Sequence, residues 1–135
     1  MLHKDITKED IFLNSFSPDP IRVDKQANVR NGGVCLYFKE SLPIIERCDL
    51  QLIPETIVAE IRLNRKKIFF ILSYCYPDRP IAEFEEYVKS LENICELIKK
   101  ENPVATVLSG DFNARSPFFG QMTRKTVMVA CFQIS

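Results

Sequence analysis

The chain has 135 residues, of which 46% are hydrophobic, which is enough to bury one core and gives no sign of a second domain. Eighteen basic and eighteen acidic residues cancel, so the chain lacks the overall positive charge of many nucleic-acid-binding proteins. Any contact with nucleic acid must therefore depend on a local patch, for which the candidates are Arg62, Arg65, Lys66, Lys67, Arg79, Arg115, Arg124 and Lys125. Scattered cations are more often ordinary solvated surface, and that alternative stays open for each of them.

The five cysteines argue against both a zinc site and a disulfide framework, because they are odd in number, widely spaced and without a CxxC pair. A reducing, intracellular compartment is therefore expected. Residues 1–5 lack the apolar stretch of a signal peptide, and no segment has the length of a membrane span, so we expect no membrane partner. The chain has a single histidine, His3, which a Ser-His-Asp or Cys-His catalytic system would have to use. We therefore do not expect such a system.

The chain is expected to open with a loop that leads into a strand. Residues 7–24 are polar and contain two prolines, which predicts loop with a short helical turn near residues 9–13. Regular structure is expected to begin near Gly33. The β-branched and aromatic residues of Val34–Phe38 predict a strand there, and Pro43 soon ends the segment after that strand.

Two further apolar segments predict a β-hairpin. Ile57–Ile61 and Lys67–Tyr74 are both rich in β-branched and aromatic residues, and Asn64-Arg65-Lys66 between them is typical of a turn. Within the second segment, Ile68–Leu72 is continuously apolar. This run predicts a central strand that is buried on both faces, between two layers.

Residues Ile81–Lys100 form the clearest predicted helix. Acidic residues near its start and Lys99 and Lys100 at its end suit the helix dipole, and Pro103 follows as a stop. Apolar residues recur at spacings of three and four, as Ile81, Phe84, Val88, Leu91, Cys95 and Ile98. Such a stripe could bind a partner, but at this spacing it is more typical of a face that packs on the core.

The most informative segment follows this helix. A short strand, Val104–Leu108, gives way to Gly110, which would let the backbone turn tightly, and to Asp111 and Asn113. Residues two apart on extended backbone point to the same side, so both polar side chains could face one ligand. The succession of strand, helix and strand places Asp111 at the carboxyl end of a strand, where ligands often bind in layered α/β proteins. The alternative is a capped turn, which also favours Asp and Asn.

Four motifs, in this order, resemble the endonuclease domain of non-LTR retrotransposons. This family is a branch of the endonuclease/exonuclease/phosphatase superfamily, which includes DNase I and the apurinic endonucleases. The motifs are RNGGVCLYFKESL (30–42), ETIVAEI (55–61), SYCYP (73–77) and GDFNAR (110–115). The resemblance covers roughly residues 9–119, and it is specific because four separate motifs agree in order and spacing.

The resemblance implies an α/β fold, namely a partial DNase I-like four-layer αββα sandwich with mixed sheets flanked by helices. It also implies one partial endonuclease domain over residues 1–119, followed by a tail, residues 120–135, that diverges from the family pattern. The expected state is a monomer with DNA as its partner. The expected location is intracellular, with the nucleus as one candidate compartment.

The same resemblance implies a role for each matching site residue. Asp111 would be the general base that orients or deprotonates the attacking water, and Asn113 would hydrogen-bond at the scissile phosphate. Tyr74 would lie near that phosphate, although Tyr76 is two residues on and would share its face of a strand. The residues after the motif, Arg115 and Ser116, would be placed to touch the DNA backbone.

The departures from the family pattern bear on activity. The catalytic set of the superfamily begins with an Asn and a metal-binding Glu on early strands and ends with an Asp-His pair, and we find no equivalents in this sequence. We therefore expect a fragment of a magnesium-dependent DNA-nicking endonuclease, inactive as given, with Mg²⁺ expected for the family but its Glu ligand not present. The alternatives are a sugar- or inositol-phosphate phosphatase of the same superfamily, or a non-catalytic relic that acts as an interaction protein.

Overall fold

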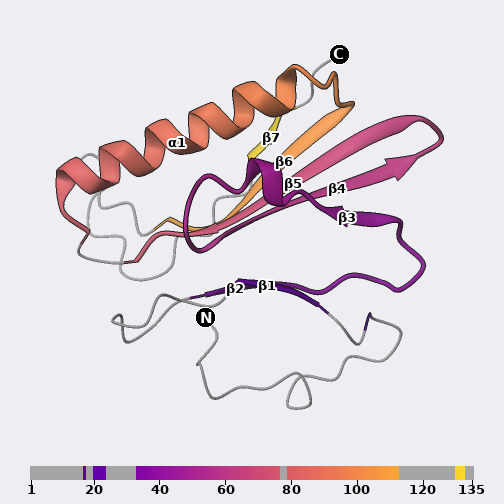
Figure 1. The fold of residues 1–135 in the computed structure, drawn as a ribbon, viewed down its shortest axis with the longest axis horizontal. Coiled ribbons are helices and arrows are strands. Elements are labelled where there is room, and N and C mark those ends of the chain that lie inside the picture. The colour runs from indigo at the N-terminus through magenta and orange to yellow at the C-terminus, as the bar shows by residue number, and fades with distance from the viewer. Residues whose placement is uncertain (1–16, 18–19, 24–32, 77–78, 113–129, 133–135) are drawn as a thin grey trace.

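The computed structural model describes residues 17, 20–23, 33–76, 79–112 and 130–132. A five-stranded sheet, in the order β3-β4-β5-β6-β7, forms the middle layer. Helix α1 covers one of its faces, and the two-stranded sheet β1-β2 lies against the other (Figure 1). The strands are β1 Ile21–Val23, β2 Val34–Leu36, β3 Ile44–Glu46, β4 Thr56–Leu63, β5 Lys66–Tyr74, β6 Ala105–Asp111 and β7 Ala130–Phe132; the helices are α1 Ile81–Lys99 and the 3-10 helix η2 Cys48–Leu50.

The predicted hairpin is confirmed as β4 and β5. The two strands pair antiparallel from Thr56 opposite Ser73 to Leu63 opposite Lys66. The two residues between them, Asn64 and Arg65, have positive φ angles of 49° and 68°. Two consecutive positive φ angles are typical of the type I′ turn, whose twist matches that of the flanking strands. Lys66, expected in the turn, is instead the first residue of β5.

Strand β5 is central, as predicted, because it pairs with antiparallel β4 on one side and with parallel β6 on the other. The prediction that it is buried on both faces is wrong for most of its length. Phe69, Ile71 and Ser73 are buried, whereas the alternate side chains are only partly buried until Tyr74. The three-residue strands β1 and β2 are too short to cover the whole opposite face, and their core cluster takes in only Leu72 and Tyr74 from β5.

Helix α1 confirms the predicted helix, but its buried face differs from the predicted stripe. The buried side chains are Tyr87, Leu91, Ile94 and Ile98, with Phe84 and Cys95 packed against them. Ile81 and Val88 were expected in the core and are 79% and 37% exposed. Successive residues are about 100° apart on a helix, so Ile81 and Val88 lie roughly 60–80° from Leu91 on one side. The true face is centred toward Tyr87 and Ile94 on the other side.

Four short elements were missed by the sequence patterns. Residues 21–23 form β1 within a segment that was expected to be loop, and β3, η2 and β7 had no prediction. The strand predicted at Val34–Phe38 is present as β2 but ends at Leu36, whereas the three residues of β1 and of β3 are too few to show a periodic pattern. The predicted helical turn near residues 9–13 lies outside the described residues. In the described part of the chain, no helix combines the length and apolar character needed to cross a lipid bilayer.

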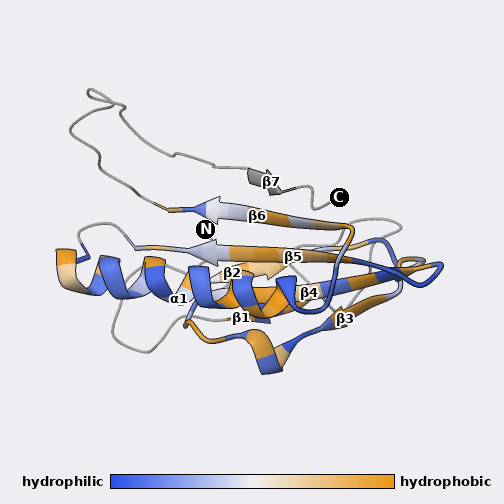
Figure 2. Cartoon of the chain, turned by 90° about the horizontal axis from the view of Figure 1, so that it is seen from above, coloured by the Kyte–Doolittle hydropathy of each residue, from blue (hydrophilic) through white to orange (hydrophobic). Residues whose placement is uncertain are grey.

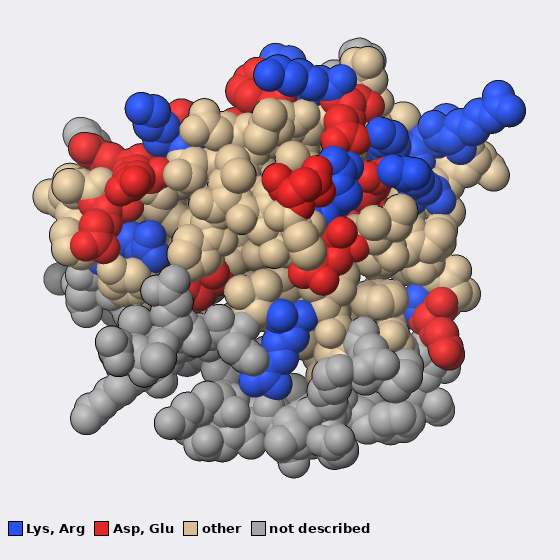
Figure 3. Space-filling model, viewed as in Figure 1, with Lys and Arg blue, Asp and Glu red and all other residues tan. Residues whose placement is uncertain are grey.

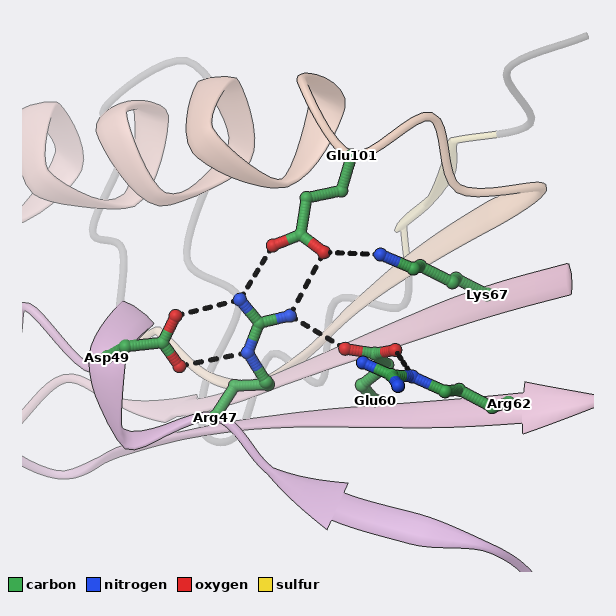
Figure 4. A network of polar contacts seen from close by, with 6 residues as sticks. All are labelled: Arg47, Asp49, Glu60, Arg62, Lys67 and Glu101. Carbon is green, nitrogen blue, oxygen red and sulfur yellow. Dashed lines mark hydrogen bonds and ion pairs between the residues drawn. The ribbon is translucent and has the colours of Figure 1, made fainter. Parts of the chain in front are cut away.

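A polar network fastens the end of α1 to the sheet (Figure 4). Arg47 lies at its centre and donates hydrogen bonds to Glu60 at 2.6 Å, to Glu101 at 2.6 and 3.1 Å and to Asp49 at 2.7 and 2.9 Å. The side chain of Glu60 is 0% exposed. Burial alone would raise the pKa of Glu60, but hydrogen bonds from Arg62 and Arg47 outweigh burial, so the net shift is downward. The network therefore keeps a buried carboxylate charged on the α1 side of β4.

Two of the candidate nucleic-acid contacts, Arg62 and Lys67, belong to this network. Arg62 pairs with Glu60, and Lys67 donates to Glu101 at 2.7 Å. Hydrogen bonds from Arg47 and Lys67 lower the pKa of Glu101 to about 2. The charges of Arg62 and Lys67 are therefore shared with carboxylates of the fold, whereas Arg65 and Lys66 stay exposed at the hairpin. Arg115, Arg124 and Lys125 lie outside the described residues.

Candidate functional site

The candidate site lies where β5 and β6 end side by side. The two strands are parallel, and their register places Tyr74 opposite Asp111. Just beyond, the amide of Cys75 donates a 2.8 Å hydrogen bond to the carbonyl of Asp111. Paired residues of neighbouring strands project from the same face, so both side chains stand on the side of β1 and β2. Figure 2 shows the apolar character of both strands giving way to polar residues at this end.

Gly110 allows the two strands to approach each other at this point. Sequence reasoning expected it to make a tight turn after the strand, but it lies within β6 and pairs with Ser73. A Cβ atom at position 110 would lie 1.8 Å from the backbone carbonyl oxygen of Ser73. Glycine is therefore required for close backbone contact rather than for a turn. As a result β6 continues past Leu108, where the predicted strand ended, and reaches Asp111.

A pocket of about 310 Å³ opens between this end of the large sheet and the edge of β2. Tyr74 and Asp111 line it from the large sheet, and Tyr37 lines it from the chain just after β2. The remaining lining residues are Gly33, Val34, Cys35, Leu72, Ser73 and Gly110. The small sheet thus forms one wall of the pocket, and the carboxyl ends of two parallel strands form the other.

Tyr74 and Asp111 differ in their exposure to solvent. Tyr74 is 6% exposed, whereas Asp111 is partly exposed. Burial, and then the neighbouring Asp111 carboxylate, raise the pKa of the Tyr74 phenol, so it stays protonated at neutral pH. A protonated phenol can donate a hydrogen bond to an anionic oxygen, and a carboxylate can accept a proton from water. The pair therefore offers one donor and one base to a ligand in the pocket.

The structure separates the two candidate tyrosines. Strand β5 ends at Tyr74, and Tyr76 lies beyond it. The Tyr76 hydroxyl donates a 2.7 Å hydrogen bond to Glu83 in the first turn of α1. Tyr76 does not line the pocket, so it is Tyr74 that the fold places beside Asp111.

Behind the site, a buried chain of hydroxyl groups joins β4, β5 and α1. The Ser73 hydroxyl lies 2.6 Å from that of Thr56 and 2.8 Å from that of Tyr87. Burial raises the pKa of Tyr87 to about 12. Sequence reasoning missed these residues, although a serine at the end of an apolar strand and a tyrosine within a predicted core helix were signals that pointed to them. These hydroxyl contacts hold α1 against the end of β5 that carries Tyr74.

The third predicted site residue, Asn113, lies outside the described residues, as do Arg115 and Ser116. The predicted tail, residues 120–135, contributes β7, which pairs antiparallel with β6 at the edge of the large sheet. The division of the chain at residue 119 stays a prediction.

The described residues around the pocket offer few protein ligands to the magnesium ion that the sequence resemblance implies. Among the described residues of the lining, Asp111 is the single carboxylate. Across the described ranges, no group of three or more His, Cys, Asp or Glu side chains is arranged to hold a metal ion. Mg²⁺ in proteins is usually held by one or two carboxylates together with phosphate oxygens and waters.

Comparison with known proteins gives one line of support for the fold. No family model matches the sequence, and no curated protein does. Among solved structures, the endonuclease domain of TRAS1, a telomere-specific non-LTR retrotransposon, is similar with a TM-score of 0.58 and 20% sequence identity. The similarity covers 80% of this chain but 45% of the TRAS1 domain. The expected partial DNase I-like α/β fold is thus confirmed: over most of its length the chain has the fold of part of a retrotransposon endonuclease domain.

Proposed function

We propose that the chain is the central part of a DNA-nicking endonuclease domain of non-LTR retrotransposon type, with Tyr74 and Asp111 at the scissile phosphate. The observation that carries the proposal is the register of β5 and β6, which sets these two side chains opposite each other over a pocket. The likeness to the TRAS1 endonuclease domain supports the same conclusion at the level of the fold.

In this role Asp111 would accept the proton of the attacking water, and the Tyr74 hydroxyl would donate a hydrogen bond to a phosphate oxygen. Burial of Tyr74 keeps its phenol protonated and so keeps this donor available. Asn113, two residues beyond Asp111, is proposed as a second hydrogen-bond partner of the phosphate. These roles use one base and neutral donors only.

We further propose that the 135-residue chain binds DNA but does not cleave it at an enzymatic rate. Charge builds up on the phosphate in the transition state, and preorganised charges supply most of the barrier reduction. The described lining of the pocket provides one carboxylate, phenol groups and no cationic side chain. The substrate would therefore be held without the stabilisation that hydrolysis needs.

The location of DNA binding can be tested by titrating the isotope-labelled chain with a short DNA duplex and following amide chemical shifts. The largest changes are expected at residues 74–76 and 111–112, with much smaller changes at the hairpin, residues 63–66. Shifts confined to the hairpin, or no shifts at all, would contradict the proposal.

The absence of cleavage can be tested with supercoiled plasmid and added magnesium. The parent chain and Asp111→Ala are expected to nick the plasmid equally little. Magnesium-dependent nicking by the parent that disappears in Asp111→Ala would show that the chain carries a complete site, and would overturn the proposed inactivity.

A further inference from the structure

Arg79 occupies an unusual position between β5 and α1. Its guanidinium carbon lies 4.3 Å from the ring centroid of Tyr76 and 4.9 Å from that of Tyr87. The planar guanidinium group stacks well on aromatic faces, and contact with two rings restricts its orientation. The cation is therefore held in place by the rings before any ligand arrives.

The charge of Arg79 is not used by the described part of the fold. Arg47, Arg62, Lys67 and Lys99 each pair with a carboxylate, whereas no ion pair joins Arg79 to a described acidic residue. Its Nε atom is buried and has no hydrogen-bond partner among the described residues. Glu83, in the adjacent first turn of α1, accepts a hydrogen bond from the hydroxyl of Tyr76 rather than from Arg79. A buried donor without a partner is uncommon in native proteins.

Arg79 also lies at the end of the sheet that carries the candidate site. Tyr87, whose ring it covers, is hydrogen-bonded to Ser73, and Ser73 lines the pocket. Both Arg79 and Asp111 act electrostatically on the thiol of Cys75, whose pKa is raised chiefly by burial.

Acidic and basic side chains are unevenly distributed over the surface. On the face drawn in Figure 3, acidic side chains are prominent at the left, where α1 begins, and basic side chains at the right, toward the hairpin. On this face, an approaching polyanion would meet prominent acidic side chains near the start of α1. A single preoriented guanidinium there has the fork of donors that matches a phosphate group.

We propose that Arg79 binds a backbone phosphate of the DNA strand whose scissile phosphate lies at Tyr74 and Asp111. This inference rests on the proposed function and adds a named anchoring residue to it. Stacking on Tyr76 and Tyr87 keeps the guanidinium oriented, and its terminal amino groups donate to the phosphate. Arg79 positions the strand and takes no part in the chemistry.

The test measures affinity for a short fluorescein-labelled DNA duplex by fluorescence anisotropy, without magnesium, over a range of salt concentrations. Arg79→Met removes the charge and keeps an apolar stem of similar length, so affinity is expected to fall about tenfold. The slope of log affinity against log salt should decrease by about one unit, as for the loss of one phosphate contact. The matched control is Lys66→Met, which removes an exposed cation at the hairpin and should change affinity by less than about twofold.

Arg79→Lys guards against a folding defect, because it keeps the charge and the apolar stem. It should bind less tightly than the parent and more tightly than Arg79→Met, since lysine lacks the planar fork. Equal affinity of Arg79→Met and the parent, an equal loss in Lys66→Met, or no binding by the parent would each overturn the proposal. If DNA shifts the amides of residues 74–76 and 111–112 while Arg79→Met still binds normally, the role of Arg79 fails and the proposed function survives.

Discussion

Replacing Arg47 with methionine removes the cation that Asp49, Glu60 and Glu101 share. The most severe consequence falls on Glu60, whose side chain is 0% exposed and 2.6 Å from Arg47. Opposite charges about 4 Å apart interact with roughly 4 kcal/mol at an effective dielectric constant of about 20. Leaving a buried charge without its partner typically costs about 3–5 kcal/mol. Because Arg62 still pairs with Glu60, we expect Arg47→Met to lower the free energy of unfolding by about 3 kcal/mol, the lower end of that range.

Urea titration followed by circular dichroism measures this loss, with the free energy taken from linear extrapolation. Asp49→Asn is the control, because the Asp49 side chain is 60% exposed and its removal should leave the midpoint nearly unchanged. The double variant Arg47→Met/Glu60→Met replaces both buried partners by apolar groups and should regain much of the lost stability. A single variant as stable as the parent, or a double variant no better than the single one, would refute the account of Glu60 as a buried charge held by Arg47.

Three further outcomes are expected from denaturant titrations of the same chain. Leu91→Ala should lower the free energy of unfolding by about 2–5 kcal/mol because Leu91 is buried in the α1 core. Val88→Ala, at a position that is 37% exposed, should change the free energy of unfolding little. Similar losses in the two variants would contradict the assigned helix face. Gly110→Ala should cost about 1–3 kcal/mol because its Cβ would meet the carbonyl oxygen of Ser73, and a neutral result would show that the strands can separate freely. The folded pKa of Glu101, about 2, lies below its ordinary value of 4.5, so its contribution is full above about pH 4.5 and should disappear as the pH falls toward 2. In Glu101→Gln this acid-dependent decline should be shallower than in the parent, and equal profiles would rule out the contribution.

Local patterns in the sequence were enough to predict the elements that are long or strongly periodic. The helix from Ile81, the hairpin around Asn64-Arg65 and the strand that delivers Asp111 are all present. Each of these signals lies within a few residues of chain, where periodicity and turn chemistry act directly. The three-residue strands β1 and β3 are too short for such a signal, and their extent is fixed by pairing with β2 and β4.

The resemblance of four motifs pointed to Tyr74 and Asp111, but it left Tyr76 as an alternative. Only the tertiary structure set Tyr74 opposite Asp111, because a parallel register depends on how β6 returns after α1 and on the close contact that Gly110 makes with Ser73.

The helix face and the polar network were likewise decided by long-range packing. A spacing of three and four residues fits two overlapping faces of one helix equally well, and contact with the sheet selected the face that contains Tyr87 and Ile94. Arg47 meets Glu101 across 54 residues of sequence. No local pattern specifies such a pairing, since it arises only when the end of α1 and the start of η2 are brought together over the same sheet.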